Sequence, residues 1–301
     1  MSIIKSFSVG NGDLFYIKHG TDNFTIIDCD LYQDRSDAIL AELQHAASDK
    51  EIRRFISTHP DEDHYHGIER IEECGLCENF YCVQNNICKD DSASFECYKK
   101  LRDHESRAYH IYKGCSRRWL NQNSDDRGSS GINVLWPIVE DGRFLEQLRK
   151  ANNGGEVNNI SPIIKYSLKD GVTAIWMGDL EKGFMNEIVD DINIPRADIL
   201  FAPHHGRKSG HVPTKWLEDM SPKIIVVGEA PSEDLCYYEN YNTITQNTAG
   251  DIEFECVDHR VHVRVSKGNL EYTFLKNLDV SGRVTSTGEY LWYVGSIETY
   301  A

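Results

Sequence analysis

The sequence predicts an α/β fold in which two β-sheets pack face to face between outer layers of helices, a four-layer αββα sandwich. Strand and helix patterns alternate along the chain, and both halves contain β-rich stretches. Histidine and aspartate side chains directly follow several of the apolar strands. The chain has 301 residues, 40% of them apolar, which can bury one sizeable core. We therefore expect a single domain over residues 1–301.

The composition limits the compartment and the partners. Met1 is followed by the alternating run Ile3–Val9 and not by an export signal, and no apolar run approaches the ~18 residues of a membrane span. Nine cysteines without an export signal suit reduced thiols. We expect a cytoplasmic protein that does not enter a membrane. The formal net charge of −16 argues against tight non-specific binding to a nucleic-acid backbone, but it permits a nucleotide-scale substrate.

The first 47 residues contain three strands and a helix. Two turns rich in Gly, Asn and Asp separate the strands, which we predict at Ile3–Val9, Leu14–Lys18 and Phe24–Asp28. The helix is predicted from Ser36 to Ala47, because its apolar residues follow helical spacing and Ser36 can cap its start.

The stretch from Phe55 to Gly67 is the most informative part of the chain. An apolar run ends at Ile56, Pro60 prevents immediate continuation of a strand or helix, and Gly67 precedes a helical pattern. The loop between them is rich in imidazoles and carboxylates, and its candidate metal ligands are His59, Asp61, Asp63 and His64. A divalent cation is the simplest way to keep these groups together. The alternative is a solvated acidic turn with incidental histidines.

The next segment shows a helix, a strand and an insertion. We predict a helix over Ile68–Glu73, a strand over Phe80–Val83 and a helical insertion over residues 84–130, in which apolar residues recur at helical spacing as far as Ile111. Cys74 and Cys77 have the two-residue gap of a zinc knuckle. No second C-x-x-C accompanies it, which favours free thiols over a structural zinc site.

The second half repeats the pattern of strands that end in polar residues. A helix over Phe144–Ala151 separates two strand regions, and an Asp-Gly turn at residues 170–171 indicates a hairpin that leads to Gly178 and Asp179. Asp179 is a candidate functional residue at the end of this strand, but a role as the N-cap of the following helix would also explain an aspartate there. Other predicted elements are strands at Ile132–Trp136, Val172–Met177, Lys223–Gly228, Ile252–Cys256, Val261–Val265 and Leu270–Leu275, a helix at Thr214–Met220, and a β-rich extension at residues 277–301. A further apolar strand precedes the P-H-H-G sequence at residues 203–206.

Two of these motifs carry a resemblance to a known family. The loop from His59 to His64 resembles the H-x-H-x-D-H signature of the metallo-β-lactamase fold superfamily, with Asp61 where most members have a second histidine. With the P-H-H-G element, it is similar to the nuclease-like domain of the bacterial competence DNA-uptake channel and its free-standing relatives. The match extends over most of the chain and implies the αββα fold with two divalent metal ions.

The resemblance also implies a set of metal ligands. Asp179 matches the carboxylate that bridges both metals, and His205 matches the last metal histidine because it directly precedes a glycine. His59 and Asp61 would complete the coordination of one ion, and Asp63 and His64 would complete that of the other. The implied metal ligands are His59, Asp61, Asp63, His64, Asp179 and His205.

Further residues receive roles through the same resemblance. Asp28 would orient the metal loop from beneath, and the alternative for it is a turn cap. Asn158 and Asn159 stand where most members have a metal histidine, so each is a weak ligand or substrate contact, or a turn former. Arg207, Lys208 and Ser209 would bind substrate phosphate, whereas a solvated face is the plain alternative. Asp63 and His204 are the candidate catalytic residues, for proton transfer at the nucleophile and the leaving oxygen.

The resemblance implies a metal-dependent hydrolase of phosphoester bonds, with a nuclease as the first expectation. The oxygen-rich site shifts the metal preference toward manganese or magnesium without excluding zinc. The expected cofactors are two divalent ions, zinc or manganese, with magnesium as a further option. The substrate would be a nucleic acid or a nucleotide-like phosphoester. Alternatives are a cyclic-nucleotide or other small phosphodiesterase, a lactam, lactone or thioester hydrolase, and a non-catalytic binding module on the same fold.

Overall fold

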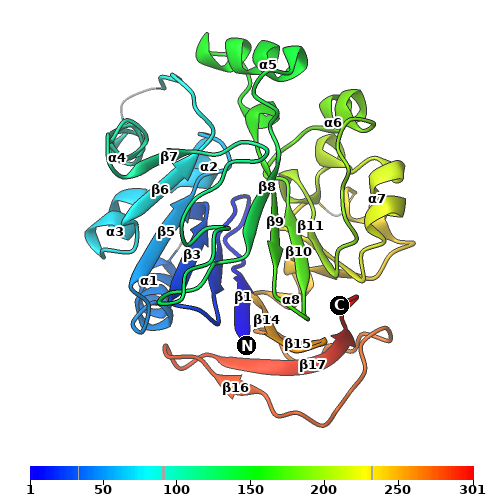
Figure 1. The fold of residues 1–301 in the computed structure, drawn as a ribbon. Helices are drawn as coiled ribbons and strands as arrows, with labels where there is room; N and C mark the ends of the chain where they lie inside the picture. Colours follow the sequence, from blue (N-terminus) through cyan, green and yellow to red (C-terminus); the bar gives the residue numbers. More distant parts are fainter. Residues whose placement is uncertain (33, 90–91, 232) are drawn as a thin grey trace.

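The computed structural model describes residues 1–32, 34–89, 92–231 and 233–301, and it contains two β-sheets (Figure 1). In the described residues the first sheet has ten strands. Their spatial order is β16 (Arg283–Val284), β17 (Tyr290–Glu298), β15 (Arg260–Val265), β14 (Ile252–Val257), β1 (Ser2–Ser6), β2 (Phe15–Lys18), β3 (Asn23–Ile27), β5 (Ile52–Ile56), β6 (Asn79–Cys82) and β7 (Ala108–His110).

The second sheet has six strands in the same described ranges. Their order is β13 (Thr243–Thr245), β12 (Ile224–Val227), β11 (Ile199–Phe201), β10 (Thr173–Trp176), β9 (Ile163–Ser167) and β8 (Ile132–Trp136). A two-residue strand, β4 (Cys29–Asp30), follows β3. In both sheets some neighbouring strands are parallel, including β3 with β5 and β10 with β11.

Helices cover the outer faces of both sheets (Figure 1). The α-helices are α1 (Ser36–Ala46), α2 (Glu62–Tyr65), α3 (Ile68–Glu73), α4 (Ala93–Arg102), α5 (Gly142–Asn152), α6 (Lys182–Ile188), α7 (Thr214–Met220) and α8 (Gln246–Ala249). Short 3₁₀ helices are η1 (Asn158–Ile160), η2 (His204–Gly206), η3 (Lys208–Gly210) and η4 (Leu235–Tyr238). None of the helices in the described ranges has the length and apolar content needed to cross a bilayer.

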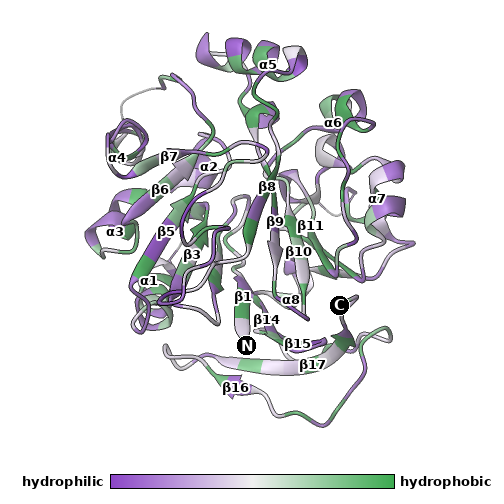
Figure 2. Cartoon of the chain, in the orientation of Figure 1, coloured by the Kyte–Doolittle hydropathy of each residue, from purple (hydrophilic) through white to green (hydrophobic). Residues whose placement is uncertain are grey.

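Two hydrophobic clusters hold the layers together. One lies between the sheets, where Phe15 of β2 contacts Trp176 of β10 and Phe201 of β11 edge-on. The other packs α1, α3 and α4 against the outer face of the first sheet. Hydrophobic residues are concentrated in the central strands, whereas the outer helices mix hydrophilic and hydrophobic positions (Figure 2). The predicted αββα sandwich is therefore confirmed.

Several element predictions were wrong in detail. Leu270–Leu275 is not a strand, because β17 takes the place beside β15 that it would need. Ala108 does not continue a helix, since α4 ends at Arg102 and β7 extends the first sheet beside β6. Ser36 is the first residue of α1 and not its cap, and its hydroxyl donates to the carbonyl of Leu31.

Candidate metal centre

Polar residues from both sheets meet at one edge of the sandwich. His59, Asp63 and His64 follow β5, whereas Asp179 follows β10 and His205 follows β11. The strands β3 and β5 are parallel, as are β10 and β11, so the loops at their carboxyl ends project from the same edge of each sheet. Loops at this position commonly form binding sites in α/β folds.

Four side chains offer ligand atoms that all lie within 4.8 Å of one another. They are Asp13, His64, Asp179 and His205. The Nε2 atoms of His59, His64 and His205 and one carboxylate oxygen of Asp179 are buried without a protein hydrogen-bond partner among the described residues. Buried polar atoms are normally paired, so this group has the composition and the unmet bonding of a metal site.

The separations suit shared coordination. His64 Nε2 lies 3.3 Å from Asp179 Oδ1, and His205 Nε2 lies 3.6 Å from Asp179 Oδ2. His59 Nε2 is 4.0 Å from the same Oδ2 atom. Ligand atoms held about 2.1 Å from a tetrahedral ion lie roughly 3.4 Å apart. Asp179 Oδ1 therefore faces His64, whereas Oδ2 faces both His59 and His205, so the carboxylate lies among all three histidines.

Asp28 holds the first two histidines in place. Its carboxylate accepts from His64 Nδ1 at 2.9 Å, from the Thr58 backbone at 2.7 Å and from the Thr58 hydroxyl at 2.6 Å. Thr58 Oγ1 is also 3.0 Å from His59 Nδ1. The structure thus places Asp28 against the loop from Thr58 to His64, with His64 Nδ1 bonded to Asp28 and His64 Nε2 facing Asp179.

Asp13 belongs to this centre, although its stretch was predicted from the sequence only as a turn. Its Oδ1 atom lies 3.2 Å from His205 Nδ1, and its backbone amide donates to the carbonyl of Asp63. A Cβ atom at Gly12 would lie 2.5 Å from the Asp30 side chain, so glycine permits this close approach. The pair formed by Asp13 and His205 joins residues 192 positions apart. The local pattern of Asn, Gly and Asp is equally typical of an ordinary turn.

The two histidines of the P-H-H-G element have different environments. His205 is buried, whereas His204 is partly exposed, with Nε2 3.7 Å from Asp179 Oδ2 and Nδ1 2.9 Å from Ser209 Oγ. Both backbones are left-handed, with φ of 53° and 56°, a strained conformation often found at functional sites. This geometry favours His205 as the metal ligand and leaves His204 on the solvent side.

Asp61 and Asp63 also differ in position. Asp63 Oδ2 lies 3.5 Å from His205 Nε2, and its Oδ1 lies 3.8 Å from His64 Nε2. Asp61 instead caps α2 and forms an ion pair with Lys89 at 2.5 Å, with its side chain 45% exposed. Asp61, like His59 and Asp63, lies outside the four-residue donor group, and because of its ion pair a ligand role would require it to leave Lys89.

The remaining site candidates surround this centre at different distances. Asn159 exchanges two hydrogen bonds with Glu181, which fixes the loop after Asp179, and Asn158 is buried beside it. Lys208 is exposed and Arg207 is partly exposed, and neither has an ion-pair partner among the described residues. The hydroxyl of Ser209 is engaged by His204.

The charges of the centre are strongly linked. Burial, with a contribution from His64, lowers the pKa of His59 to about 3. Burial would lower the pKa of His205 as well, but Asp13 and Asp179 outweigh it and raise that pKa to about 10. Burial raises the pKa of Asp179, yet the neighbouring His64 and His205 more than offset this and hold it well below its usual value. Asp179 is therefore ionised, as a metal ligand must be.

A carboxylate-rich recess adjoins the centre. It has a volume of about 520 Å³ and is lined by Asp30, Tyr32, Asp61, Glu62, Asp63 and His66. The ring of Tyr32 lies against that of His66, with 5.1 Å between centroids. This side of the centre would repel a long polyanion.

The cysteines form no second metal centre in the part of the chain that the structure describes. All nine are free, and the donor group around Asp13 is the only set of three or more such side chains in that part. Burial raises the pKa of the Cys77 thiol well above its usual value, which keeps the thiol protonated. Cys74 and Cys77 therefore behave as the free thiols that the sequence favoured.

Comparison with known proteins gives structural likeness only. No protein-family model and no curated protein sequence matches the chain. Similar solved structures include the metallo-β-lactamase IND-7, with 13% identity, 58% of this chain and 65% of that chain covered, and a TM-score of 0.33. CmlA, a diiron β-hydroxylase from Streptomyces venezuelae, is 11% identical. The match covers 76% of this chain and 44% of CmlA, with a TM-score of 0.44.

A third similar structure is a Thermotoga maritima protein described as a zinc-dependent hydrolase of the metallo-β-lactamase superfamily. It is 11% identical, and the match covers 76% of this chain and 77% of that protein, with a TM-score of 0.35. The chain thus spans less than two thirds of the length of IND-7 and CmlA. At these identities and TM-scores the likeness says nothing about chemistry, and the αββα assignment depends on the sheet order and the layers.

Proposed function

We propose that this protein is a metal-dependent hydrolase of phosphoester bonds, with a nuclease as the first candidate. The observation that carries the proposal is the convergence of unpaired, buried Nε2 atoms of His59, His64 and His205 on the carboxylate of Asp179. The loop sequence with Asp61 and the P-H-H-G element supports the phosphoester class through their resemblance to nuclease-like relatives. Arg207 and Lys208, close in sequence to His205, support it through their charge.

The proposed cofactors are two divalent ions, with zinc or manganese first and magnesium as a third option. His59, Asp61 and Asp179 would hold one ion, and Asp63, His64 and His205 the other, with Asp179 shared and Asp13 behind His205. Bound ions would lower the pKa of a water molecule and neutralise charge on the phosphoryl group.

The remaining steps belong to the protein's own side chains. Asp63 is 33% exposed on the open side of the centre, where its carboxylate would accept the proton of the attacking water. His204 has its Nδ1 atom held by Ser209, which leaves Nε2 to donate a proton to the leaving oxygen. Arg207 and Lys208 would contact the non-reacting phosphate oxygens.

A second candidate is a phosphodiesterase for a cyclic nucleotide or another small diester. The recess formed by Asp30, Asp61, Glu62 and Asp63 favours it, because these carboxylates would repel the neighbouring phosphates of a long strand. The net charge of −16 likewise favours a small diester over a long nucleic-acid strand.

The test combines elemental analysis of the purified protein with a hydrolysis screen. The substrates are single-stranded DNA, duplex DNA, RNA, cyclic nucleotides and a chromogenic bis-phosphodiester. We expect bound zinc or manganese and cleavage of at least one phosphodiester. Asp179→Asn should lower metal content and activity together, whereas Asp170→Asn, in an exposed turn, should alter neither. Hydrolysis of a lactam or thioester without any phosphodiester cleavage would refute the proposal.

A further inference from the structure

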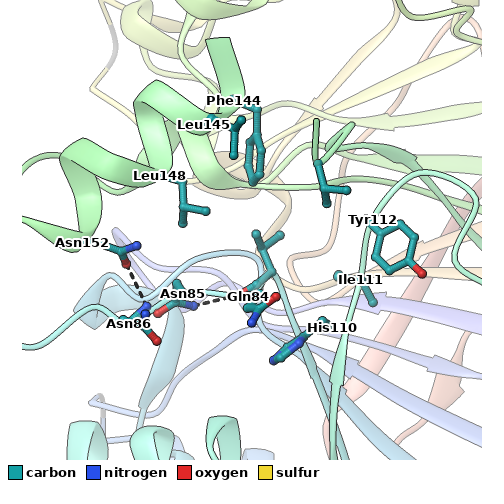
Figure 3. A pocket seen from close by; sticks show the side chains of 12 residues that line it. Gln84, Asn85, Asn86, His110, Ile111, Tyr112, Phe144, Leu145, Leu148 and Asn152 are labelled. Atoms are coloured by element: carbon teal, nitrogen blue, oxygen red, sulfur yellow. Dashed lines mark hydrogen bonds between the residues drawn. The ribbon is translucent and has the colours of Figure 1, made fainter. Parts of the chain in front are cut away.

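A cavity of about 450 Å³ lies between helix α5 and the loops that follow β6 and β7 (Figure 3). Phe144, Leu145 and Leu148 project from α5 into it. Gln84, Asn86 and Tyr112 line the opposite side. The backbone amide of Asn86 donates to Asn152 Oδ1 at 2.8 Å, which joins the two sides. The volume is within the range of about 300–1,000 Å³ that is usual for small-molecule sites.

The strand register places this cavity beside the metal centre. Ile56 of β5 pairs with Tyr81 of β6, and Tyr81 pairs with Tyr109 of β7. His59, Gln84 and Tyr112 each follow these paired residues by three positions, in the loops beyond the carboxyl ends of three adjacent parallel strands. Because neighbouring strands are about 4.8 Å apart, the cavity begins one strand away from the metal histidine and extends to the next.

Two further contacts connect the cavity walls to the metal centre. Lys89, three residues after Asn86, forms an ion pair with Asp61. On the other side, α5 leads into η1, where Asn159 is hydrogen-bonded to Glu181 just beyond Asp179. These two contacts tie both walls of the cavity to residues next to the candidate metal centre.

The walls are uncharged and combine flat apolar surface with amides. Among the described residues that line the cavity there is no Lys, Arg, Asp or Glu, and burial lowers the pKa of His110, which keeps it neutral. The side-chain amides of Gln84 and Asn86 have no protein hydrogen-bond partner in the described structure. Tyr112 is 40% exposed and Leu145 is 48% exposed, so both present apolar surface that a ligand can cover.

We propose that this cavity binds one nucleobase of the substrate whose phosphodiester lies at the metal centre. Such base binding rests on the proposed phosphoester chemistry and deepens it. A base has a flat apolar face that stacks on an aromatic ring and an edge that pairs with amides, which is what Tyr112, Gln84 and Asn86 provide. The absence of lining cations excludes the cavity as the phosphate site, since phosphates are held by charge.

One cavity of this size takes one base. The base can therefore belong either to a terminal nucleotide of a strand or to a small nucleotide diester. Base binding also explains how a strongly acidic protein would retain such a substrate: stacking and amide contacts do not depend on positive charge.

The test compares diesters with and without a nucleoside. Methyl p-nitrophenyl phosphate has none, whereas the 5′-(p-nitrophenyl) phosphates of thymidine and adenosine each carry one, and all release the same chromophore. We expect Tyr112→Ala and Gln84→Ala to lower kcat/KM for at least one nucleoside ester about tenfold and to leave that for the methyl ester within twofold. Tyr290→Ala is the matched control, because Tyr290 is 42% exposed and does not line the cavity.

Equal losses on the methyl and nucleoside esters, or no loss on any, would overturn the base-binding inference. A failure of the proposed function looks different: the wild-type protein would cleave none of the diesters. In that case, binding of free thymidine and adenosine is measured by saturation-transfer NMR on the metal-loaded protein. Binding that Tyr112→Ala abolishes would retain the cavity assignment without the chemistry, and an absence of binding would remove both.

Discussion

At the residue scale, the centre depends on carboxylates that each perform a different task. Asp179 lies between histidines from both sheets, Asp28 orients His64, and Asp13 contacts His205. A neutral amide in any of these positions keeps the shape of the side chain but removes the charge that a metal and its histidines need. Single Asp→Asn substitutions should therefore separate these roles.

Asp28→Asn should weaken metal binding without abolishing it. Partners of metal-binding histidines typically contribute about 10- to 100-fold in affinity, and Asp28 accepts from both His64 and Thr58. Titration against a chelating dye measures the change, with Asp170→Asn as the control. An affinity equal to that of the wild-type protein would show that Asp28 is only a turn residue.

Replacing Arg207 and Lys208 together by alanine should leave metal content unchanged and raise KM. Removing each charge-assisted hydrogen bond to phosphate would weaken substrate binding by about 1–3 kcal/mol. Added salt should mimic this weakening, because ions screen exposed charges over roughly 8–10 Å at physiological strength. Alanines at Arg149 and Lys150, an exposed pair on α5, serve as the control. Unaltered KM values in the Arg207 and Lys208 variant would mean that phosphate is bound elsewhere.

At the element scale, the turn after β11 requires glycine at position 206 for two reasons, its backbone conformation and its close packing. Gly206 has φ of 86°, and a Cβ atom there would lie 2.4 Å from Val227 Cγ1 on β12. The same turn holds His204 and His205 in left-handed conformations. Close packing against β12 therefore fixes the direction in which His205 points.

Gly206→Ala should destabilise the protein and lower its metal affinity. The left-handed backbone costs about 1–2 kcal/mol with a side chain, and overpacking against Val227 adds about 1–3 kcal/mol. Gly288→Ala is a matched control, with φ of 87° and nothing within 4 Å of the new Cβ. Denaturant unfolding gives the free energies of unfolding. Equal losses of stability in both variants would show that the contact with Val227 is unimportant.

At the scale of the whole molecule, the candidate metal centre contains residues from both halves of the sandwich. His59, Asp63 and His64 come from the first sheet, whereas Asp179 and His205 come from the second. A bound ion would cross-link the sheets at the edge where the site opens. Metal binding and stability of the sandwich should then be coupled.

Removing metal with a chelator should lower Tm by several degrees. A ligand present at 100 times its Kd stabilises the folded state by about 2.7 kcal/mol, and each kcal/mol moves Tm by roughly 2–4 °C in a chain of 150–250 residues. Differential scanning calorimetry with and without EDTA measures the shift. The Asp179→Asn variant should show a much smaller response. A wild-type Tm that changes neither with EDTA nor with added zinc or manganese would contradict the proposed metal cross-link between the sheets.

The sequence alone determined the layers and indicated the histidine-bearing loops that the structure brings together, because the relevant signals are local. Apolar runs that stop at Pro or Gly mark strand ends, and the clusters at His59–His64 and at residues 203–206 stand directly beyond them. Only the tertiary structure decided features that depend on a distant partner. Asp13 joins the centre through its contact with His205. Residues 108–110 form strand β7 because they pair with β6, and β17 instead of Leu270–Leu275 pairs with β15. Neighbours in sequence cannot encode these choices, since the competing partners lie far along the chain and meet only when the sheets pack.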